Sequence, residues 1–240
     1  MINRDKKNKT GLEKDFVKIG HRGACGYELE NSMASFRKAL DLGVDAIELD
    51  VHACKTGEAV VIHDDIVDRV TDGGKEEVAD KTLREIKSLS MKNGEKIPTL
   101  EELLSIVNGE VSVNVEIKDR LVVRETAEII KRSLRDGNWK EEDFIISSFD
   151  MENLFLFKKE MPKIKIGALA KDLPLDYEII KELGAYSVNL PFGIIDEKIV
   201  KDFHNRGFRV FVFTVNEYED ILKVKRAGVD GIFSDFPDRL

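Results

Sequence analysis

Short runs of aliphatic and β-branched residues alternate with amphipathic segments along almost the whole chain, and this alternation restricts the fold more than any other feature. The apolar runs are Phe16–Gly20, Ala46–Val51, Val60–His63, Val111–Ile117, Phe144–Ser148, Lys165–Leu169, Tyr186–Leu190, Arg209–Val215 and Asp230–Ser234. Between most of them, apolar residues recur at three- and four-residue spacing, which predicts helices, for example over Ser32–Leu42, Leu100–Val107, Leu121–Leu134, Asp176–Leu183, Asp196–Arg206 and Glu217–Ala227. Strands that alternate with helices in this way form βα units around a parallel sheet.

One of the nine runs differs from the others because no helix precedes it. Val60–His63 follows Ala46–Val51 across only Lys55-Thr56-Gly57-Glu58, which predicts a β-hairpin. Eight parallel strands then remain, the number that closes a TIM (β/α)8 barrel, although an open doubly wound sheet also fits the pattern. A turn centred on Thr56-Gly57 would place His63 opposite Asp50, with Cβ atoms about 5 Å apart.

The length of 240 residues suits a single barrel domain. We predict a flexible tail over residues 1–15 and one domain over 16–240, with a small insertion at about 52–98 that covers the barrel mouth. The tail is polar and lacks the apolar core of a signal peptide, and no apolar run is long enough to cross a bilayer. These features predict a cytoplasmic protein.

The overall charge argues against a nucleic-acid partner. The net charge is -8, and the Lys and Arg residues are scattered rather than gathered into a basic stripe. The two cysteines, Cys25 and Cys54, lack the spacing of a zinc knuckle or a disulfide framework, so free thiols are expected.

Three acidic side chains are predicted to meet at the carboxyl ends of the strands, where barrel enzymes place their catalytic residues. Glu48 and Asp50 are two residues apart on one strand and therefore point to the same face, and Glu116 ends the next barrel strand. Three converging carboxylates would repel one another without a cation, and oxygen ligands suit Mg²⁺ or Ca²⁺. The alternative is that these acids form structural salt bridges with Lys or Arg.

Two histidines at strand ends are candidates for acid–base catalysis. His21 and His63 titrate near neutral pH, and attack at phosphorus needs one group to accept a proton and another to donate one. Arg22 and Lys118 would offset the charge of a phosphate. Supporting and structural roles, respectively, are expected for the two remaining histidines, His52 and His204.

Several segments in the same order resemble the glycerophosphodiester phosphodiesterase family. They are His21-Arg22-Gly23, Glu30-Asn31-Ser32, Gly43 to Val51, Val60 to Asp64, Ile97 to Glu102, Asn114 to Lys118, Ser147 to Asp150, Thr214-Val215-Asn216 and Gly228 to Asp235. The resemblance extends over nearly the whole chain from Phe16 onward. It implies a TIM barrel with a small insertion after strand two, and hydrolysis of deacylated phospholipids to an alcohol and sn-glycerol 3-phosphate.

The resemblance also implies roles for individual residues. The catalytic histidines map to His21 and His63, and the ligands of one divalent cation, Mg²⁺ or Ca²⁺, map to three carboxylates, Glu48, Asp50 and Glu116. Arg22 and Lys118 map near the phosphate of a small glycerophosphodiester. Phe213 stands where the family often has Trp, so it is expected to affect the packing of the glycerol or head group. The segment Glu30-Asn31 also fits a helix start capped by Asn31.

Three other functions fit parts of the pattern. A phospholipase-like lyase on a similar barrel would release a cyclic phosphate as its final product. A non-catalytic barrel binding protein would have lost a histidine or a metal-binding acid, and none is missing. A sugar-phosphate isomerase or aldolase would need a buried strand lysine, a role that only Lys118 could fill.

Overall fold

The computed structural model describes Leu12 and residues 16–240 of the chain. The strands are β1 (Val17–Gly20), β2 (Ala46–Ala53), β3 (Ala59–Val61), β4 (Ser112–Ile117), β5 (Phe144–Ser148), β6 (Lys165–Leu169), β7 (Ser187–Pro191), β8 (Arg209–Phe213) and β9 (Gly231–Ser234). The α-helices are α1 (Met33–Asp41), α2 (Leu83–Ser88), α3 (Leu100–Val107), α4 (Val122–Arg135), α5 (Met151–Glu160), α6 (Tyr177–Leu183), α7 (Glu197–Asn205) and α8 (Tyr218–Ala227). Short 3-10 turns are η2 (Val78–Asp80), η3 (Glu141–Asp143), η4 (Phe192–Ile194) and η5 (Pro237–Arg239).

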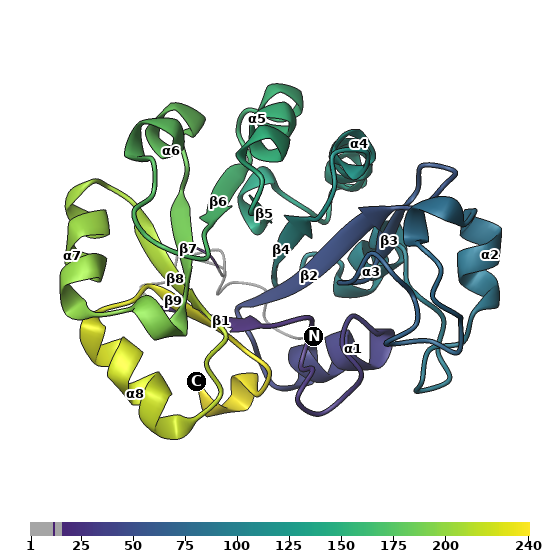
Figure 1. Cartoon of the computed structure of the whole chain (residues 1–240), viewed down its shortest axis with the longest axis horizontal. Coiled ribbons are helices and arrows are strands. Elements are labelled where there is room, and N and C mark those ends of the chain that lie inside the picture. Colours follow the sequence, from purple (N-terminus) through teal and green to yellow (C-terminus); the bar gives the residue numbers. More distant parts are fainter. Residues whose placement is uncertain (1–11, 13–15) are drawn as a thin grey trace.

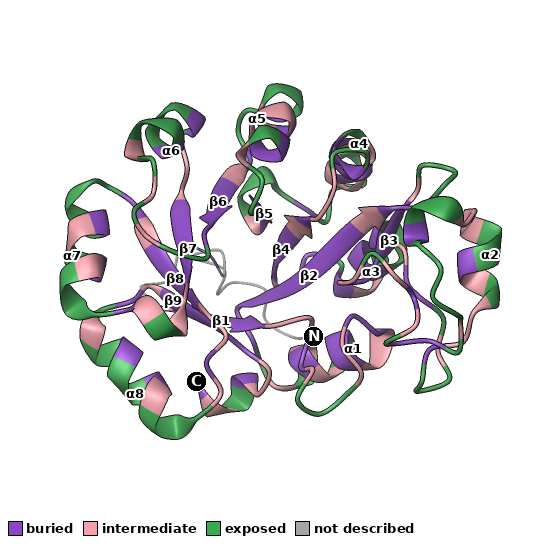
Figure 2. Cartoon of the chain, in the orientation of Figure 1, coloured by how far each residue is buried: buried purple, intermediate pink, exposed green. Residues whose placement is uncertain are grey.

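Within residues 16–240, eight parallel strands close into a barrel, which confirms the predicted TIM fold. Strand β1 pairs with both β2 and β9, and the other neighbours follow the order β2, β4, β5, β6, β7, β8 and β9. Helices α4 to α8 surround the strands from outside (Figure 1). The strands are buried on both faces, whereas the helices expose their outer faces (Figure 2). This double burial explains why the strand sequences are nearly all apolar.

The predicted helices are present with small differences at their ends, and one predicted cap is wrong. Ser32 rather than Asn31 caps α1, because the Ser32 side chain accepts a hydrogen bond from the Ser35 N–H. Ser32 has the extended backbone that an N-cap requires, whereas Asn31 has a left-handed φ of 54°. Asn31 is thereby free to turn its side chain toward β2.

The hairpin is present, but its predicted register is wrong by one residue. Val51 pairs with Val61, and the Ile62 N–H donates to the Asp50 carbonyl oxygen, so Ile62 and not His63 lies opposite Asp50. The turn runs from Cys54 to Glu58 and is closed by a hydrogen bond from the Cys54 N–H to the Glu58 carbonyl oxygen. The turn is therefore centred on Thr56 alone, and not between Thr56 and Gly57. A slip of one residue would turn His63 away from the site if the strand continued. The strand ends at Val61, however, and the chain then changes direction.

The segment between β3 and α3 forms a small lobe with its own apolar core. Val67, Val78, Ile86 and Ile97 are all buried in this core. The lobe lies within the range 52–98 predicted for the insertion, but residues up to Val61 belong to the β2–β3 hairpin. It extends to one side of the barrel next to β2 and β3 (right of Figure 1). It connects to the barrel mouth through the chain that leaves β3.

The predicted flexible tail over residues 1–15 lies outside the described residues, except for Leu12. The Leu12 side chain is buried with Val17 and Phe211 in the barrel interior, and its carbonyl oxygen accepts hydrogen bonds from Tyr186 and Arg209. Among the described helices, none combines the length and the apolar character needed to cross a membrane.

Candidate active site

The three predicted acids meet at the barrel mouth. Glu48 and Asp50 leave the same face of β2, and Asp50 is the register partner of Glu116 on the neighbouring strand β4. One carboxylate oxygen from each residue lies within 4.8 Å of the other two. Glu48 is 3% exposed and Asp50 is 1% exposed. Three acids at this distance in a buried place make a strongly negative centre.

Burial and mutual repulsion change the pKa values of this centre. Burial, with the nearby charge of Asp50, raises the pKa of Glu48 to about 8 and also raises the pKa of Glu116. For Asp50, burial is outweighed by the charges of Lys118 and Arg22, and its pKa is lowered. Burial and the proximity of Asp50 therefore disfavour the charged forms of Glu48 and Glu116, and a bound cation would favour those charged forms.

Two cations lie against the acids. The Lys118 ammonium is 2.7 Å from Glu116 and 3.3 Å from Asp50, and the Arg22 Nε atom is 3.4 Å from Asp50. Asp50 and Glu116 thus form the salt bridges that were the alternative expectation. Glu48 differs, because its Oε2 atom accepts a hydrogen bond from the backbone N–H of Arg22 at 2.7 Å.

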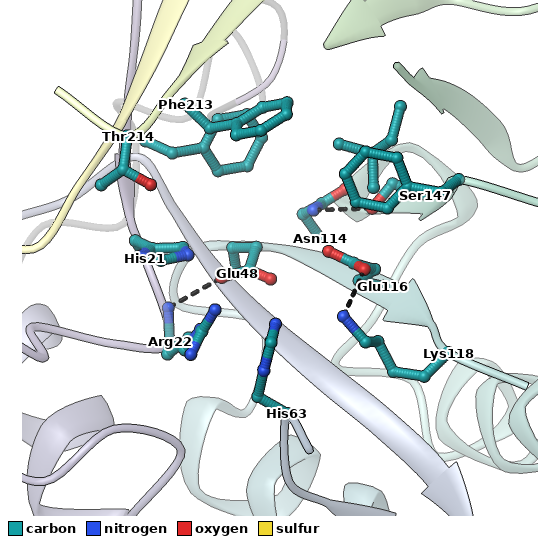
Figure 3. A pocket seen from close by; sticks show the side chains of 13 residues that line it. His21, Arg22, Glu48, His63, Asn114, Glu116, Lys118, Ser147, Phe213 and Thr214 are labelled. Atoms are coloured by element: carbon teal, nitrogen blue, oxygen red, sulfur yellow. Dashed lines mark hydrogen bonds and ion pairs between the residues drawn. The ribbon is translucent and has the colours of Figure 1, made fainter. Parts of the chain in front are cut away.

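The two histidines reach the acids from different parts of the chain (Figure 3). His21 follows β1, and its Nδ1 atom is 2.7 Å from Asp235, which follows β9. His63 follows β3, and its Nδ1 atom is 2.6 Å from Asp64. In each ring one nitrogen is therefore held by a carboxylate, and the ring lines the same cavity as Glu48.

The pKa values of the two histidines shift in opposite directions. For His21, burial lowers the pKa, but the hydrogen bond to Asp235 and the charge of Glu48 outweigh burial, so the pKa is raised. For His63, burial also lowers the pKa, and the carboxylates of Asp50 and Asp64 only partly offset it. The protein therefore favours the charged form of His21 and the neutral form of His63.

His52 supports the loop that carries His63, as expected. Its Nε2 atom lies 3.1 Å from the His63 carbonyl oxygen, and its Nδ1 atom lies 3.2 Å from the Asp119 carboxylate. Asp119 also accepts a hydrogen bond from the Ala53 N–H at the end of β2. His204 lies elsewhere, 2.8 Å from Asp230, which agrees with its predicted structural role.

The cavity in front of these groups has a volume of about 170 Å³ and two different walls. The two histidines, Arg22, Lys118, Glu48 and Glu116 form one wall, and Phe149, Leu169, Phe213 and Phe233 form the other. The rings of Phe149 and Phe213 stand perpendicular to each other with centroids 6.0 Å apart. A ligand with one anionic end and one end rich in carbon would match both walls.

Comparison with known proteins identifies the family of this barrel. Residues 21–239 match the model of the glycerophosphoryl diester phosphodiesterase family. The chain belongs to the glycerophosphodiester phosphodiesterase family. It is 40% identical to the glycerophosphodiester phosphodiesterase of Caldanaerobacter subterraneus subsp. tengcongensis, over 92% of this chain and 95% of that protein. It is 35% identical, with the same coverage of both chains, to the glycerophosphodiester phosphodiesterase of Bacillus altitudinis.

Solved structures of glycerophosphodiester phosphodiesterases share the fold. An Oleispira antarctica phosphodiesterase, solved in complex with the product sn-glycerol-3-phosphate, superposes with a TM-score of 0.85 and 27% identity, covering 94% of each chain. A Silicibacter pomeroyi structure gives a TM-score of 0.85 and 26% identity, covering 95% of this chain and 94% of that one. The chain is accordingly a phosphoric diester hydrolase.

The structure of this phosphodiesterase brings together all eight residues that the sequence singled out. Seven line the cavity and Asp50 lies directly behind it; the seven are His21, Arg22, Glu48, His63, Glu116, Lys118 and Phe213. Sequence reasoning missed the partners of these residues. Asn31, which was assigned to a helix cap, donates to Asp50 at 2.9 Å, and Asp235 holds His21.

A chain of ion pairs that the sequence did not indicate borders the site. Arg69, from the lobe after β3, contacts Glu30 through both terminal nitrogens, at 2.5 and 2.7 Å, and its Nε atom donates to Asp64. Glu30 also accepts from Arg22 at 2.7 Å, and Asp64 is the partner of His63. Arg69 therefore connects the residues that hold Arg22 and His63. The only sequence signal was the presence of an Arg close to the His63-Asp64 pair.

Proposed function

We propose that this enzyme hydrolyses small glycerophosphodiesters to sn-glycerol 3-phosphate and an alcohol, with His21 and His63 as the acid–base pair. The observation that carries the proposal is that both histidines line one cavity together with two cations, Glu48 and Glu116, the last two of which form a cluster with the buried Asp50. The sn-glycerol-3-phosphate in the Oleispira antarctica relative supports the choice of substrate class.

The acidic centre fits a hard divalent cation. Its donors are carboxylate oxygens from Glu48, Asp50 and Glu116, and burial together with the charge of Asp50 raises the pKa values of Glu48 and Glu116, an effect that a bound cation would oppose. When bound there, Mg²⁺ or Ca²⁺ would neutralise phosphate charge and polarise a phosphoryl oxygen.

Arg22 and Lys118 are proposed to hold the phosphate. Both line the cavity, and both are held there by carboxylates, Arg22 by Glu30 and Asp50 and Lys118 by Glu116 and Asp50. An Arg guanidinium can bind two phosphate oxygens at once, and a Lys ammonium acts as a point charge. Phe213 and Phe149, on the opposite wall, would pack against the carbon atoms of the glycerol or the head group.

The histidines are proposed to have different tasks. Asp235 favours the protonated form of the His21 ring, and His21 donates a proton to the leaving alkoxide oxygen. His63, which favours the neutral form, accepts the proton of the attacking hydroxyl. The attacking group is either a water molecule or the 2-hydroxyl group of the substrate's glycerol. If the 2-hydroxyl attacks, a cyclic phosphate forms before the final product.

Three alanine variants test the assignment of the histidines. His21→Ala and His63→Ala are each expected to lower kcat by at least about 100-fold while the variants still fold, as the far-ultraviolet circular dichroism spectrum would show. His204→Ala is the matched control, because this histidine pairs with Asp230 away from the cavity and should retain wild-type activity. Near-normal turnover in either active-site variant would refute the role of that histidine.

A further inference from the structure

A second group of metal-binding side chains lies beside the phosphate cavity. It consists of His21, Cys25 and Asp235, each of which offers one ligand atom within 4.8 Å of the other two. The Cys25 thiol is 2.9 Å from Asp235 Oδ1 and 3.9 Å from His21 Nδ1, and Nδ1 is 2.7 Å from the same Oδ1 atom. All three residues are partly accessible to solvent.

Contacts from other elements hold this group in place. Asp235 Oδ2 accepts a hydrogen bond from the Asn216 side-chain amide nitrogen at 2.6 Å, and the Asp235 N–H donates to the side-chain Oδ1 atom of Asn216 at 2.9 Å. The loop that carries Cys25 is tied to the same place, because the Gly26 N–H donates to the Asp235 carbonyl oxygen. A Cβ atom on Gly26 would lie 2.4 Å from the Phe236 ring, so the loop approaches this segment as closely as glycine permits. The donors are therefore gathered before any ligand arrives.

The chemistry of these donors differs from that of the acidic centre. Thiolate sulfur, imidazole nitrogen and one carboxylate oxygen are the ligands that Zn²⁺ and similar thiophilic cations bind, whereas Mg²⁺ and Ca²⁺ prefer oxygen alone. We propose that His21, Cys25 and Asp235 form a binding site for a thiophilic divalent cation, which inhibits the enzyme by engaging His21.

The cluster needs only small movements to accept such an ion. Zinc bonds of about 2.0 to 2.3 Å in tetrahedral geometry separate the ligand atoms by roughly 3.3 to 3.6 Å. The two distances to Asp235 must therefore lengthen by about 0.6 Å, and the distance from sulfur to nitrogen must shorten by roughly 0.3 Å. Three protein ligands leave the fourth position for water, as in other accessible zinc sites.

Binding replaces protons with the cation. Burial and the hydrogen bond to Asp235 raise the pKa of the Cys25 thiol, so the free thiol keeps its proton. When Zn²⁺ binds to the thiol and to a doubly protonated His21, one proton leaves sulfur, one leaves Nδ1, and both enter solvent. Sulfur and Nδ1 each then donate an electron pair to the ion, and Asp235 remains ionised throughout.

The expected consequence is loss of the acid function of His21. With Nδ1 bound to the ion, the remaining proton is on Nε2 of a neutral ring, and the imidazolium form is no longer available. The ring is also held by the cation instead of by Asp235 alone. Inhibition through this route should not be relieved by additional Mg²⁺, because Mg²⁺ has little affinity for a site with sulfur and nitrogen donors.

Cobalt and zinc titrations of wild-type and Cys25→Ser enzyme test the proposal. Co²⁺ bound to the wild-type chain should give the intense near-ultraviolet absorption of a thiolate–cobalt bond, and Cys25→Ser should abolish it. With Mg²⁺ saturating, Zn²⁺ should inhibit the wild-type enzyme, and Cys25→Ser should raise the Zn²⁺ concentration needed by at least about tenfold. The inhibition measurement depends on the proposed role of His21, whereas the absorption measurement does not.

Cys54→Ser is the matched control, since Cys54 is the other cysteine of the chain and bonds to Glu58 in the hairpin turn. This variant should keep both the absorption band and the sensitivity to zinc. The proposal is wrong if wild-type enzyme shows no thiolate–cobalt band, if the band persists in Cys25→Ser, or if zinc inhibits both enzymes equally. Absence of phosphodiesterase activity before zinc is added would instead contradict the proposed function.

Discussion

Replacing Asp235 with Asn should weaken catalysis by changing the proton affinity of His21. Asp235 Oδ1 lies 2.7 Å from His21 Nδ1, and Oδ2 is fixed by Asn216. An Asn side chain keeps the shape but removes the negative charge that favours the protonated ring. The pKa of His21 should therefore fall, and His21, the proposed general acid, should lose its proton at a lower pH than in the wild-type enzyme.

The pKa of Asp235 sets the size of the effect on stability. Burial raises this pKa, but hydrogen bonds from His21, Cys25 and Asn216 outweigh burial and lower it to about 2. Compared with a usual value near 3.9, the difference corresponds to roughly 2.6 kcal/mol, an upper limit because the side chain is 25% exposed. Since the folded-state pKa is lowered, this stabilisation is present above about pH 4 and is lost as the pH falls through about 2.

The assay is the pH dependence of kcat/KM, together with urea unfolding at pH 7 and at pH 3. Asp235→Asn is expected to lower kcat/KM about 100-fold or more and to shift the alkaline limb of the profile to lower pH. Its deficit in unfolding free energy should be smaller at pH 3 than at pH 7. Asp238→Asn is the control, because Asp238 contacts Tyr27 and not His21. An unchanged alkaline limb in Asp235→Asn would refute the proposed dependence of His21 on this carboxylate.

Three further substitutions have distinct expected effects. Arg69→Ala should raise KM several-fold while changing the free energy of unfolding by less than about 1 kcal/mol, because the Arg69 side chain is 44% exposed; Arg84→Ala, in the same lobe, should be neutral in both assays. Lys118→Met should lower kcat/KM by about 100-fold, since its ammonium lies at the cavity wall, and steady-state kinetics would measure this loss. Phe157→Ala, fully buried between barrel and helices, should cost about 3 to 5 kcal/mol in urea unfolding while leaving KM unchanged in the fraction that folds.

The alternation of strands and helices predicted a parallel sheet because each apolar run needs cover on both faces, but it fits an open sheet as well as a closed barrel. The resemblance to the family implied the barrel. The run Val60–His63 was correctly predicted to lie outside the barrel, because the short connection after Ala46–Val51 leaves no room for the helix that a parallel strand requires. Its register could not be predicted from the turn residues, because a turn of five residues from Cys54 to Glu58 and one of even length fit the sequence equally well. His63 still reaches the cavity because the chain leaves the ladder after Val61.

The residues that point into the cavity were predictable from strand-end positions, whereas their supporting partners were not. Glu48 and Asp50 share a face through the two-residue period of a strand, a local property of the sequence. Asn31 and Asp235 reach Asp50 and His21 across 19 and 214 positions of the chain. Such contacts depend on how the loops at the barrel mouth fold, and the local composition of Glu30-Asn31-Ser32 favoured a helix cap instead.

We propose that one cavity of this enzyme combines a divalent cation with two histidines to cleave a glycerophosphodiester. The most direct measurement is the release of glycerol 3-phosphate from a panel of glycerophosphodiesters in Mg²⁺, Ca²⁺ or a chelator, with wild-type enzyme and with Glu48→Gln. Wild-type enzyme should release glycerol 3-phosphate from at least one substrate with a cation present, and both the chelator and Glu48→Gln should abolish release. Release that continues unchanged in the chelator, or no release from any substrate, would contradict the claim.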